Sequence, residues 1–324
     1  MRCTGHLRPA RADRRIAMSD LVQIVGAVLL AALGGEAFLK SILGAAVHLR
    51  VPKAVVATTL AAFATSSPEL TVSSVAALAG QPEIGLGDAL GSNVVNIALI
   101  FGLALLFGAI QTSRQDFGRD YYLALATPVL TLLLALDGHI VRWEALLLLA
   151  IFMIWLAWTV RNALRQRNST VTIEAGALSP GKSLILGVLG LGALIAAGRL
   201  FVSGATGIAA AFSVDTYVIG VLLVAIGTSL PELVTVILSR LRGHDEVGVG
   251  TLIGSNLFNG LAIVGVAGVI HPISVPLAEV ALTLACGIFA LLLLLPNRAG
   301  LIVRGRGYFL LIFYAGFVWA TLQS

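Results

Sequence analysis

The stretch Ala64-Thr65-Ser66-Ser67-Pro68-Glu69, followed by Gly91-Ser92-Asn93-Val94-Val95-Asn96, is polar within apolar surroundings. It returns as Gly227-Thr228-Ser229-Leu230-Pro231-Glu232, followed by Gly254-Ser255-Asn256-Leu257-Phe258-Asn259, with the same internal spacing. We call these the first and the second motif. A carboxylate inside a membrane is costly, so its duplication predicts a function, and cation binding is the natural one.

The composition predicts an integral membrane protein. Hydrophobic residues make up 58% of the chain and charged residues 11%, and the mean hydropathy of +0.98 lies outside the range of soluble domains. A membrane helix needs roughly 20 apolar residues, and short charged breaks divide the chain into such stretches. They are residues 20–47, 54–79, 84–110, 121–136, 140–161, 183–212, 216–239, 247–270, 276–295 and 305–322.

The two motifs divide these ten stretches into two equivalent halves. The first motif falls on the second and third stretches, and the second motif falls on the seventh and eighth. Because five spans separate equivalent helices, the second copy enters the membrane from the opposite side. We therefore predict an all-α integral membrane protein of ten transmembrane helices, built as two inverted five-helix repeats within a single transmembrane domain over residues 1–324. The predicted repeats are residues 18–161 and 183–324, and residues 162–182 form a cytoplasmic linker.

Basic residues gather in alternate breaks, which sets the orientation by the positive-inside rule. Arg119, Lys182 and Arg242 mark the breaks that we predict to be cytoplasmic, whereas Glu83 and Asp137 lie in breaks of the other set. This pattern predicts a multi-pass protein of the cell membrane, the inner membrane of a prokaryote, with both termini outside.

The amino-terminal tail disagrees with this orientation, because residues 1–17 are rich in arginine. We interpret them as a non-native or disordered leader, with the true start at Met18, directly before the first apolar stretch. A cleaved signal peptide is the alternative, since a basic stretch before an apolar one looks similar.

Several other classes of function fit the sequence poorly. The net charge of +5 does not indicate nucleic-acid binding, because the basic residues flank the predicted spans. Cys3 and Cys286 are too few for a disulfide framework or a metal cluster, and we expect no cofactor. An intramembrane enzyme needs a base beside its nucleophile, and no His or Lys lies near the motif serines, so we expect no enzymatic activity. A cation channel is a further alternative, which counterflux would distinguish.

The motifs carry oxygen donors at helical spacing. Residues three and four apart share a helix face, so Thr65, Ser66 and Glu69 point one way, and Ser92 and Asn96 do likewise. Hard cations such as Ca²⁺ take about six to eight oxygen ligands. Two motifs that face each other would supply two carboxylates with hydroxyl and amide oxygens, which predicts a cation cage near the membrane midplane.

Each motif also contains a proline, which frees a backbone oxygen. Pro68 and Pro231 lack an N–H group, so the carbonyls of Ala64 and Gly227 lose their helical partners. A freed carbonyl is tolerated in lipid only where protein, water or an ion meets it. These two carbonyls are therefore candidate ligands.

Two further pairs occupy equivalent positions in the two halves. Asn93 and Asn256 follow the motif serines, and we interpret them as packing or capping groups. Glu36 and Arg199 either pair with each other or extend separately toward water.

The two motifs resemble the paired α-repeats of the cation/Ca²⁺ antiporter superfamily, nearest its prokaryotic sodium/calcium exchanger branch, and the resemblance covers nearly the whole chain. It implies an antiporter that exchanges Ca²⁺ for Na⁺ by alternating access, with helices 1 and 6 sliding across the other eight. Its partners would be the two transported ions and membrane lipid, with no nucleic acid and no required oligomer. The implied ion ligands are Glu69, Glu232, Thr65, Thr228, Ser66, Ser229, Ser92, Ser255, Asn96 and Asn259, with the backbone oxygens of Ala62 and Ala225.

The chain departs from the family pattern at two positions. Ala64 stands where the family usually has Gly, and Asn259 stands where potassium-dependent relatives carry Asp, which weakens a potassium role. The proton/calcium branch usually has a different phrase around its glutamates, so Ca²⁺/H⁺ antiport is the second candidate. The implied carbonyls of Ala62 and Ala225 lie two residues before those that the proline argument favours, and both sets stay open.

Overall fold

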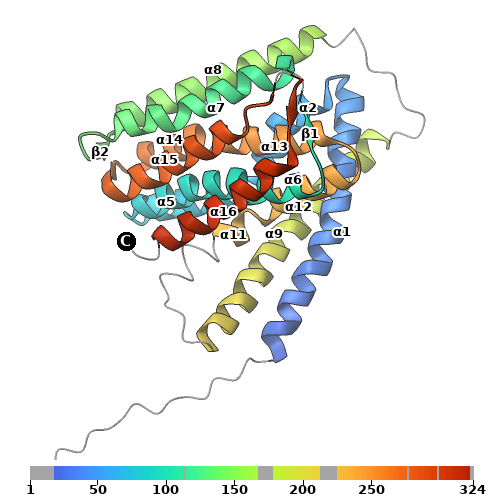
Figure 1. Cartoon of the computed structure of the whole chain (residues 1–324), viewed down its shortest axis with the longest axis horizontal. Helices are drawn as coiled ribbons and strands as arrows, with labels where there is room; N and C mark the ends of the chain where they lie inside the picture. Colours follow the sequence, from blue (N-terminus) through green and yellow to red (C-terminus); the bar gives the residue numbers. More distant parts are fainter. Residues whose placement is uncertain are drawn as a thin grey trace, which may run out of the picture.

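The computed structural model of the chain describes residues 18–112, 114–166, 178–211, 225–275, 277–297 and 299–321. Most of these residues are helical (Figure 1). The first half contains α1 (Met18–Leu49), α2 (Lys53–Val56), η1 (Ala57–Ala61), α3 (Ala62–Thr65), α4 (Ser67–Leu78), α5 (Pro82–Val94), η2 (Val95–Phe101), α6 (Gly102–Leu106), β1 (Ile110–Gln111), α7 (Arg114–Leu134), β2 (His139–Ile140) and α8 (Arg142–Gln166). The second half contains α9 (Pro180–Ala211), α11 (Ala225–Thr228), α12 (Leu230–Leu241), α13 (Asp245–Leu257), η4 (Phe258–Ile263), α14 (Val264–Ile270), β3 (Ile273–Ser274), α15 (Leu277–Leu293), β4 (Leu301–Ile302) and α16 (Arg304–Thr321).

Some of the predicted segments lie outside the described residues. These are the leader at residues 1–17 and the central part of the linker, residues 167–177. The first part of the seventh apolar stretch, up to residue 224, also lies outside them. At the near ends of the linker, α8 continues to Gln166 and α9 begins at Pro180, so both helices extend into the predicted linker range.

The apolar helices agree with an integral membrane protein. In the described part of the chain, five helical spans are long and apolar enough to cross a membrane. Helices overlap all ten predicted stretches, whereas the number of ten spans and their inverted arrangement stay predictions. The five spans are Met18–Leu49, Pro82–Leu106, Arg142–Arg165, Pro180–Phe201 and Asp245–Ile270.

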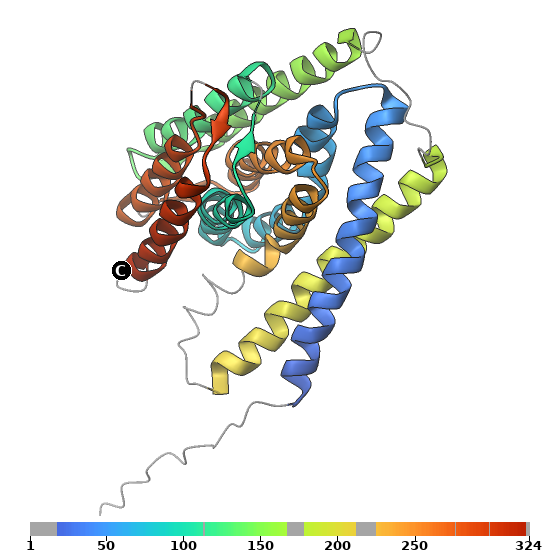
Figure 2. The same ribbon diagram turned by 45° about the vertical axis from the view of Figure 1, so that its right-hand side comes forward.

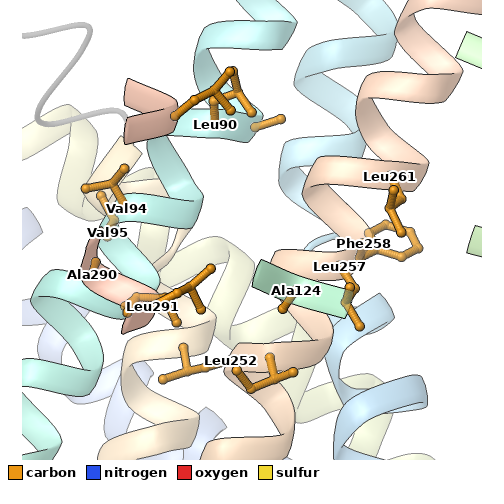
Figure 3. Close-up of a cluster of buried hydrophobic side chains, with 14 of the residues drawn as sticks. Leu90, Val94, Val95, Ala124, Leu252, Leu257, Phe258, Leu261, Ala290 and Leu291 are labelled. Carbon is orange, nitrogen blue, oxygen red and sulfur yellow. The ribbon is translucent and has the colours of Figure 1, made fainter. Parts of the chain in front are cut away.

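The helices that carry the motifs form the centre of the molecule. Of the 18 most hydrophobic consecutive residues in each span, 72% are buried in Pro82–Leu106 and 83% in Asp245–Ile270. The corresponding fractions are 28% in Met18–Leu49 and 22% in Pro180–Phe201. Figure 3 shows part of this core, in which Leu90 and Val94 of α5 and Leu257 of α13 are buried. Burial of this extent means that polar groups on the central helices face protein rather than lipid.

Helices α1 and α9 form a long pair beside this centre. They lie side by side in both views and run obliquely to the rest of the molecule (Figures 1 and 2). Small residues let the two backbones approach, since a Cβ atom added at Gly190 would lie 2.6 Å from the backbone nitrogen of Phe38. Large apolar side chains such as Leu29 and Val188 are exposed on the pair, which suits contact with lipid.

The helix that carries each motif breaks at the motif serine. Ser66 separates α3 from α4 with ψ 9°, and Ser229 separates α11 from α12 with the same ψ. Pro68 and Pro231 lie in the first turn of the helix that follows. That position tolerates proline because its missing N–H would have no intrahelical partner there, whereas a continuous helix would lose a hydrogen bond. The two prolines therefore account for both breaks.

The third and eighth predicted stretches contain a different irregularity. The wide turns η2 and η4 are π-helical, and each begins at the end of the α-helix that carries the second part of a motif. Such turns often mark functional sites. Asn96 lies on η2 and Asn259 on η4.

Two short antiparallel ladders accompany the helices, which make up most of the described residues. Ile110 of β1 lies opposite Ile302 of β4, and Ile140 of β2 lies opposite Ile273 of β3. Each strand has two residues, too few for the alternating pattern that identifies a strand in a sequence. Each ladder joins one predicted repeat to the other.

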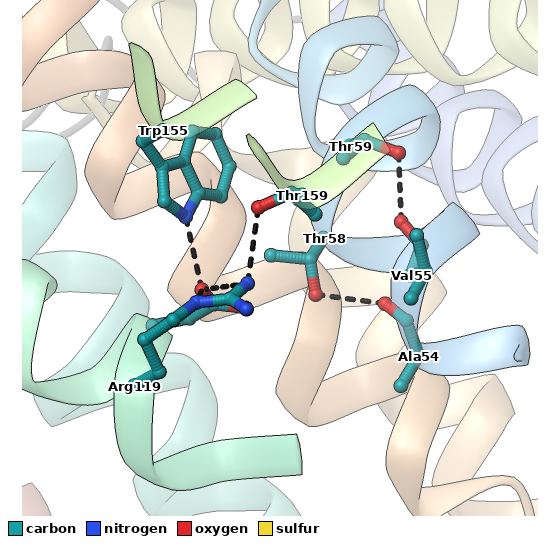
Figure 4. A network of polar contacts seen from close by, with 8 residues as sticks. Ala54, Val55, Thr58, Thr59, Arg119, Trp155 and Thr159 are labelled. Atoms are coloured by element: carbon teal, nitrogen blue, oxygen red, sulfur yellow. Dashed lines mark hydrogen bonds and ion pairs between the residues drawn. The ribbon is translucent and has the colours of Figure 1, made fainter. Parts of the chain in front are cut away.

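Polar contacts tie the peripheral helices α7 and α8 together (Figure 4). The buried carboxylate of Asp120 accepts hydrogen bonds from Arg119 at 2.8 Å and from the Trp155 indole at 2.9 Å, and Arg119 also donates to Thr159. The Arg119 guanidinium carbon lies 3.6 Å from the centre of the Trp158 ring. A buried carboxylate that is paired and hydrogen-bonded in this way is structural.

Of the two alternatives for Glu36 and Arg199, the mutual pair is wrong. Glu36 of α1 instead pairs with Lys40 at 3.3 Å and with Arg242 at 2.9 Å. Arg242 follows α12 directly, so this ion pair links α1 to the end of α12. Arg199 is exposed on α9 and lines a cavity described below.

Candidate cation site

The two motif glutamates are buried and face each other's helix break. Glu69 and Glu232 lie in the first turns of α4 and α12, and each is 1% exposed. The Ser66 hydroxyl donates to Glu232 Oε1 at 3.1 Å, and the Ser229 hydroxyl donates to Glu69 Oε1 at 3.4 Å. Each carboxylate is therefore held by the serine of the other motif.

Additional hydroxyls surround Glu232. Ser255 of α13 donates to Glu232 Oε1 at 3.2 Å. The Thr65 hydroxyl lies 3.5 Å from that of Ser255 and donates to the Ala61 carbonyl at 3.0 Å. The structure thus brings Thr65, Ser66, Ser229 and Ser255 together with the two glutamates.

The amide side chains lie on helices that pack across the two halves. Helix η2, with Asn96, contacts α12, and η4, with Asn259, contacts α4. Asn96 and Asn259 are both buried. Each amide therefore lies on an element that packs against the helix of the other half's glutamate.

Hydrogen bonds between Asn93 and Asn256 join the central helices, as expected of packing groups, while Asn93 Oδ1 has no partner among the described residues. Asn93 donates to the backbone oxygen of Asn256 at 3.3 Å, and Asn256 donates back to that of Asn93 at 3.4 Å. Asn96 Nδ2 donates to Asn256 Oδ1 at 3.1 Å. Because this bond occupies the nitrogen of Asn96, its Oδ1 stays available to another group.

Several buried oxygens of the motifs lack a hydrogen-bond partner. Burying a carboxylate or amide oxygen without a partner is costly, and most buried polar groups in proteins are paired. Oxygen atoms from carboxylates, hydroxyls and amides are the ligands of hard cations, so a bound cation would satisfy them. Within the described residues, these atoms are Glu69 Oε2, Glu232 Oε2, Ser92 Oγ, Asn93 Oδ1, Asn96 Oδ1 and Asn259 Oδ1.

The backbone oxygens of the first motif are partly occupied. The Ser67 hydroxyl donates to the Ala64 carbonyl at 2.7 Å, so the oxygen that Pro68 frees has a partner within the motif. The Ala62 carbonyl accepts the Ser66 N–H at 3.0 Å. It also accepts a long hydrogen bond of 3.4 Å from the Thr65 hydroxyl, so an ion would have to displace that hydroxyl to bind there. In the second motif, Ala225 begins α11.

A cavity of about 420 Å³ borders the motifs between α4, α9 and the start of α12. Pro68 and Pro231 line it from the two broken helices, and Thr228 lines it beside them. Arg199 lies on its α9 wall. The cavity therefore gives access to the edge of the second motif.

The structure adds Asp88 to the polar residues of this region. Asp88 lies on α5, four residues before Ser92, and its Oδ2 is buried without a hydrogen-bond partner among the described residues. Duplication of the motifs does not identify Asp88, because the equivalent residue of the second half is Thr251. Its spacing from Ser92 on one helix face was the available signal.

The site has few charged ligands. Among the described residues, no three His, Cys, Asp or Glu side chains lie close enough together to hold a metal ion. The candidate site consists of two carboxylates with neutral oxygens. That donor set suits a hard cation rather than a soft transition metal.

Comparisons with known proteins agree with these features. Residues 19–161 and 182–323 match the family model described as sodium/calcium exchanger protein. The inner membrane protein YrbG of Escherichia coli is 34% identical over 230 residues, which cover 68% of this chain and 71% of that protein. The sodium/calcium exchanger MaX1 of Methanosarcina acetivorans is 28% identical over 349 residues, which cover 94% of this chain and 98% of that protein.

The fold is similar to that of a solved exchanger. A structure of the sodium-calcium exchanger NCX_Mj, soaked with 10 mM Na⁺ and 10 mM Sr²⁺, matches with a TM-score of 0.78 and 28% identity. The match covers 92% of this chain and 96% of that one. From the family model and these relatives, we conclude that the chain belongs to the sodium/calcium exchanger family.

Proposed function

We propose that the protein is an antiporter that exchanges Ca²⁺ for Na⁺ across the membrane by alternating access. The observation that carries this proposal is the pair of buried glutamates, Glu69 and Glu232, each held by a serine of the other motif and each with an unpartnered oxygen. Membership of the sodium/calcium exchanger family supports it. The protein is then a transporter and not an enzyme, and its substrates are the two ions.

The proposed ligands are the oxygens that surround this pair. Glu69 and Glu232 bind both ions in turn, and the hydroxyls and amides complete the shell. The unpartnered oxygens support the amides and Ser92 as ligands. The other proposed ligands are Thr65, Thr228, Ser66, Ser229 and Ser255, with the backbone oxygens of Ala62 and Ala225.

The charge of the site explains obligatory exchange. Two carboxylates balance one Ca²⁺ or two Na⁺, whereas an empty ionised pair in a low dielectric is costly. The ion-free protein therefore changes slowly between its inward-facing and outward-facing states. Binding of either Ca²⁺ or Na⁺ lowers the barrier to that change. This coupling keeps Ca²⁺ from leaking down its gradient.

The proposed architecture is ten spans in two inverted five-helix repeats, with residues 18–161 and 183–324 as the repeats and both termini outside. The equivalent breaks at Ser66 and Ser229 and the two π-helical turns support it. We assign the change of access to α1 and α9, which move across the other helices. Their glycine-lined contact and their low burial suit a pair that moves as one unit against the centre.

The test is transport in proteoliposomes that contain the purified protein. An outward Na⁺ gradient is expected to drive uptake of radioactive Ca²⁺, and a pH gradient alone is expected to leave uptake at the background of protein-free vesicles. Uptake with a pH gradient but not with a Na⁺ gradient would show a Ca²⁺/H⁺ antiporter. Uptake that needs no counter-ion would show a channel.

A further inference from the structure

Four asparagines meet where the two halves pack together, and they form two equivalent pairs. Asn93 and Asn256 donate to each other's backbone oxygen, at 3.3 Å and 3.4 Å. Asn96 and Asn259 follow them by three residues in the two halves. The reciprocal bonds of the first pair are alike in the two halves, so a difference between the halves has to come from the second pair.

A single hydrogen bond distinguishes the two halves at these asparagines. Asn96 Nδ2 donates to Asn256 Oδ1 at 3.1 Å. The equivalent bond of the other half would run from Asn259 Nδ2 to Asn93 Oδ1. Both of these atoms are buried without a hydrogen-bond partner among the described residues. A matched donor and acceptor are therefore present in both halves, but they are joined in only one.

The packing of the helices brings the second donor and acceptor onto neighbouring elements. Helix η2 packs against α13, which joins Asn96 to Asn256. Helix η4 packs against α5 in the same way, and these two elements carry Asn259 and Asn93. Because a buried polar atom without a partner costs free energy, a shift of η4 along α5 that formed this bond would satisfy two such atoms at once.

A small cavity explains how the protein tolerates the free acceptor in this conformation. It has a volume of about 10 Å³, and Asn93, Asn256, Thr127 and Gly260 lie on its wall. That volume suits one water molecule, which can donate to Asn93 Oδ1 until Asn259 does so.

The bond between Asn96 and Asn256 also decides how the amide of Asn96 is oriented. Its nitrogen is held by Asn256, so its oxygen is presented to the proposed cation cage. The amide of Asn259 has no such restraint, since its nitrogen and its oxygen both lack partners among the described residues. In this conformation, one of the two proposed amide ligands is therefore positioned and the other is not.

We propose that Asn256 and Asn93 are positioning residues for the amides of Asn96 and Asn259, and that they act in turn. The bond from Asn96 to Asn256 stabilises the access state seen here, and the bond from Asn259 to Asn93 replaces it in the opposite state. The proposal rests on the exchange function and the inverted repeats proposed above. An interaction that is made in only one of two states shifts the equilibrium toward that state.

The test compares Asn256→Leu with Asn93→Leu, since Leu has nearly the shape of Asn without its polar atoms. Each variant removes one of the two reciprocal bonds, but only Asn256→Leu removes the bond to Asn96. Any difference between the two variants therefore reports on that bond and not on the general packing of the helices.

The populations of the two access states are measured from a distance across the larger cavity. Thr71 of α4 and Ser203 of α9 are exposed residues that line this cavity of about 420 Å³. Spin labels at Thr71→Cys and Ser203→Cys, with Cys3→Ser and Cys286→Ala to remove the natural thiols, give the distance distribution by pulsed electron paramagnetic resonance. The purified full chain is measured without Ca²⁺ or Na⁺.

The two variants are expected to shift the populations in opposite directions. In Asn256→Leu, the ratio of the state seen here to the opposite state is expected to fall about fivefold, which corresponds to roughly 1 kcal/mol, the usual net value of one hydrogen bond. In Asn93→Leu, the ratio is expected to rise. The double variant loses both bonds and is expected to return toward the ratio of the labelled parent, whereas damage to packing would accumulate.

The results separate this proposal from the proposed function. An unchanged ratio in Asn256→Leu, or a shift of both single variants in the same direction, refutes the alternating bonds. Ca²⁺ uptake driven by Na⁺ in wild type is measured separately, so the exchange function can stand when the alternating bonds fail. Where a Leu variant does not fold, Asn256→Ala and Asn93→Ala make the same comparison with smaller side chains.

Discussion

The first and second motifs have the same backbone but differ in how their side chains are satisfied. Both helices break at a serine before a proline. Glu232 accepts hydrogen bonds from Ser66 and Ser255, whereas Glu69 accepts a long one of 3.4 Å from Ser229. The two motifs therefore have the same backbone geometry, while among the described residues the first half has more buried side-chain oxygens without partners.

The stability of the two halves therefore depends unequally on a bound ion. The hydroxyl of Ser255 is paired within the protein, and that of Ser92 is not. A paired group contributes to the stability of the empty protein, whereas an unpaired buried group costs free energy until a ligand meets it.

Loss of either glutamate charge is expected to abolish exchange. We predict that Glu69→Gln and Glu232→Gln each lower Na⁺-driven Ca²⁺ uptake by more than about 100-fold, a change of roughly 2.7 kcal/mol, because one carboxylate cannot balance Ca²⁺. The measurement is uptake into proteoliposomes, with size-exclusion chromatography to check folding. Glu83→Gln, at the exposed start of α5, is the control and is expected to transport like wild type. Wild-type uptake by either folded motif variant would rule out the site.

The two motif serines are expected to separate binding from stability. Ser92→Ala removes a hydroxyl that has no partner, so it should weaken Ca²⁺ binding without lowering the thermal stability of the ion-free protein. Ser255→Ala removes a donor to Glu232, so it should weaken binding and also destabilise the ion-free protein by about 1–3 kcal/mol. Thermal unfolding in ion-free buffer and Ca²⁺ binding are the two measurements. Equal stability losses in both variants would contradict the asymmetry.

The motif glycines test the packing of the two halves. A Cβ atom at Gly254 would lie 2.7 Å from the Cβ of Ala62, whereas at Gly91 it would meet no atom of the described residues within 4 Å. Gly254→Ala is therefore expected to destabilise the protein by about 1–3 kcal/mol. Gly91→Ala is expected to be neutral or stabilising by less than about 1 kcal/mol, since Ala favours the helix. Denaturation of both variants in detergent measures the difference, and equal losses would refute it.

The ion pair between α1 and α12 is expected to have the smallest effect. Glu36 and Arg242 are partly exposed, and such pairs contribute about 0–1 kcal/mol. Glu36→Gln and Arg242→Gln, alone and combined, should give a coupling energy within that range in a double-mutant cycle of thermal stability. A coupling above about 2 kcal/mol would show that the contact is shielded from solvent to an unexpected degree.

The features of the fold that could be predicted from the sequence arise from residues close together in the chain. Apolar length predicted the helices, and Pro68 and Pro231 predicted that the motif helices break. The spacing of Thr65, Ser66 and Glu69 predicted oxygen donors on one helix face, and all three side chains are buried in the protein interior. The structure agrees because each of these features depends on residues close in the chain.

Two of the missed features depend on residues far apart in the chain. The two-residue ladders have no sequence pattern, and the pair of Glu36 with Arg242 depends on the oblique position of α1. Asp88 has no acidic counterpart in the second half, where Thr251 stands, so the duplication does not reveal it. The bond from Ser67 to Ala64 is local, but it competes with an ion for the same oxygen, and only the structure shows that the hydroxyl takes it.

Competition between Na⁺ and Ca²⁺ tests whether Glu69 and Glu232 bind both ions at one site. Binding of radioactive Ca²⁺ to the purified protein is measured while Na⁺ is added, for wild type and for the double variant Glu69→Gln/Glu232→Gln. We predict that Na⁺ displaces Ca²⁺ from wild type and that the double variant binds neither ion at the central site. Wild-type Ca²⁺ binding in the folded double variant, or Ca²⁺ binding to wild type that Na⁺ cannot displace, would contradict the account.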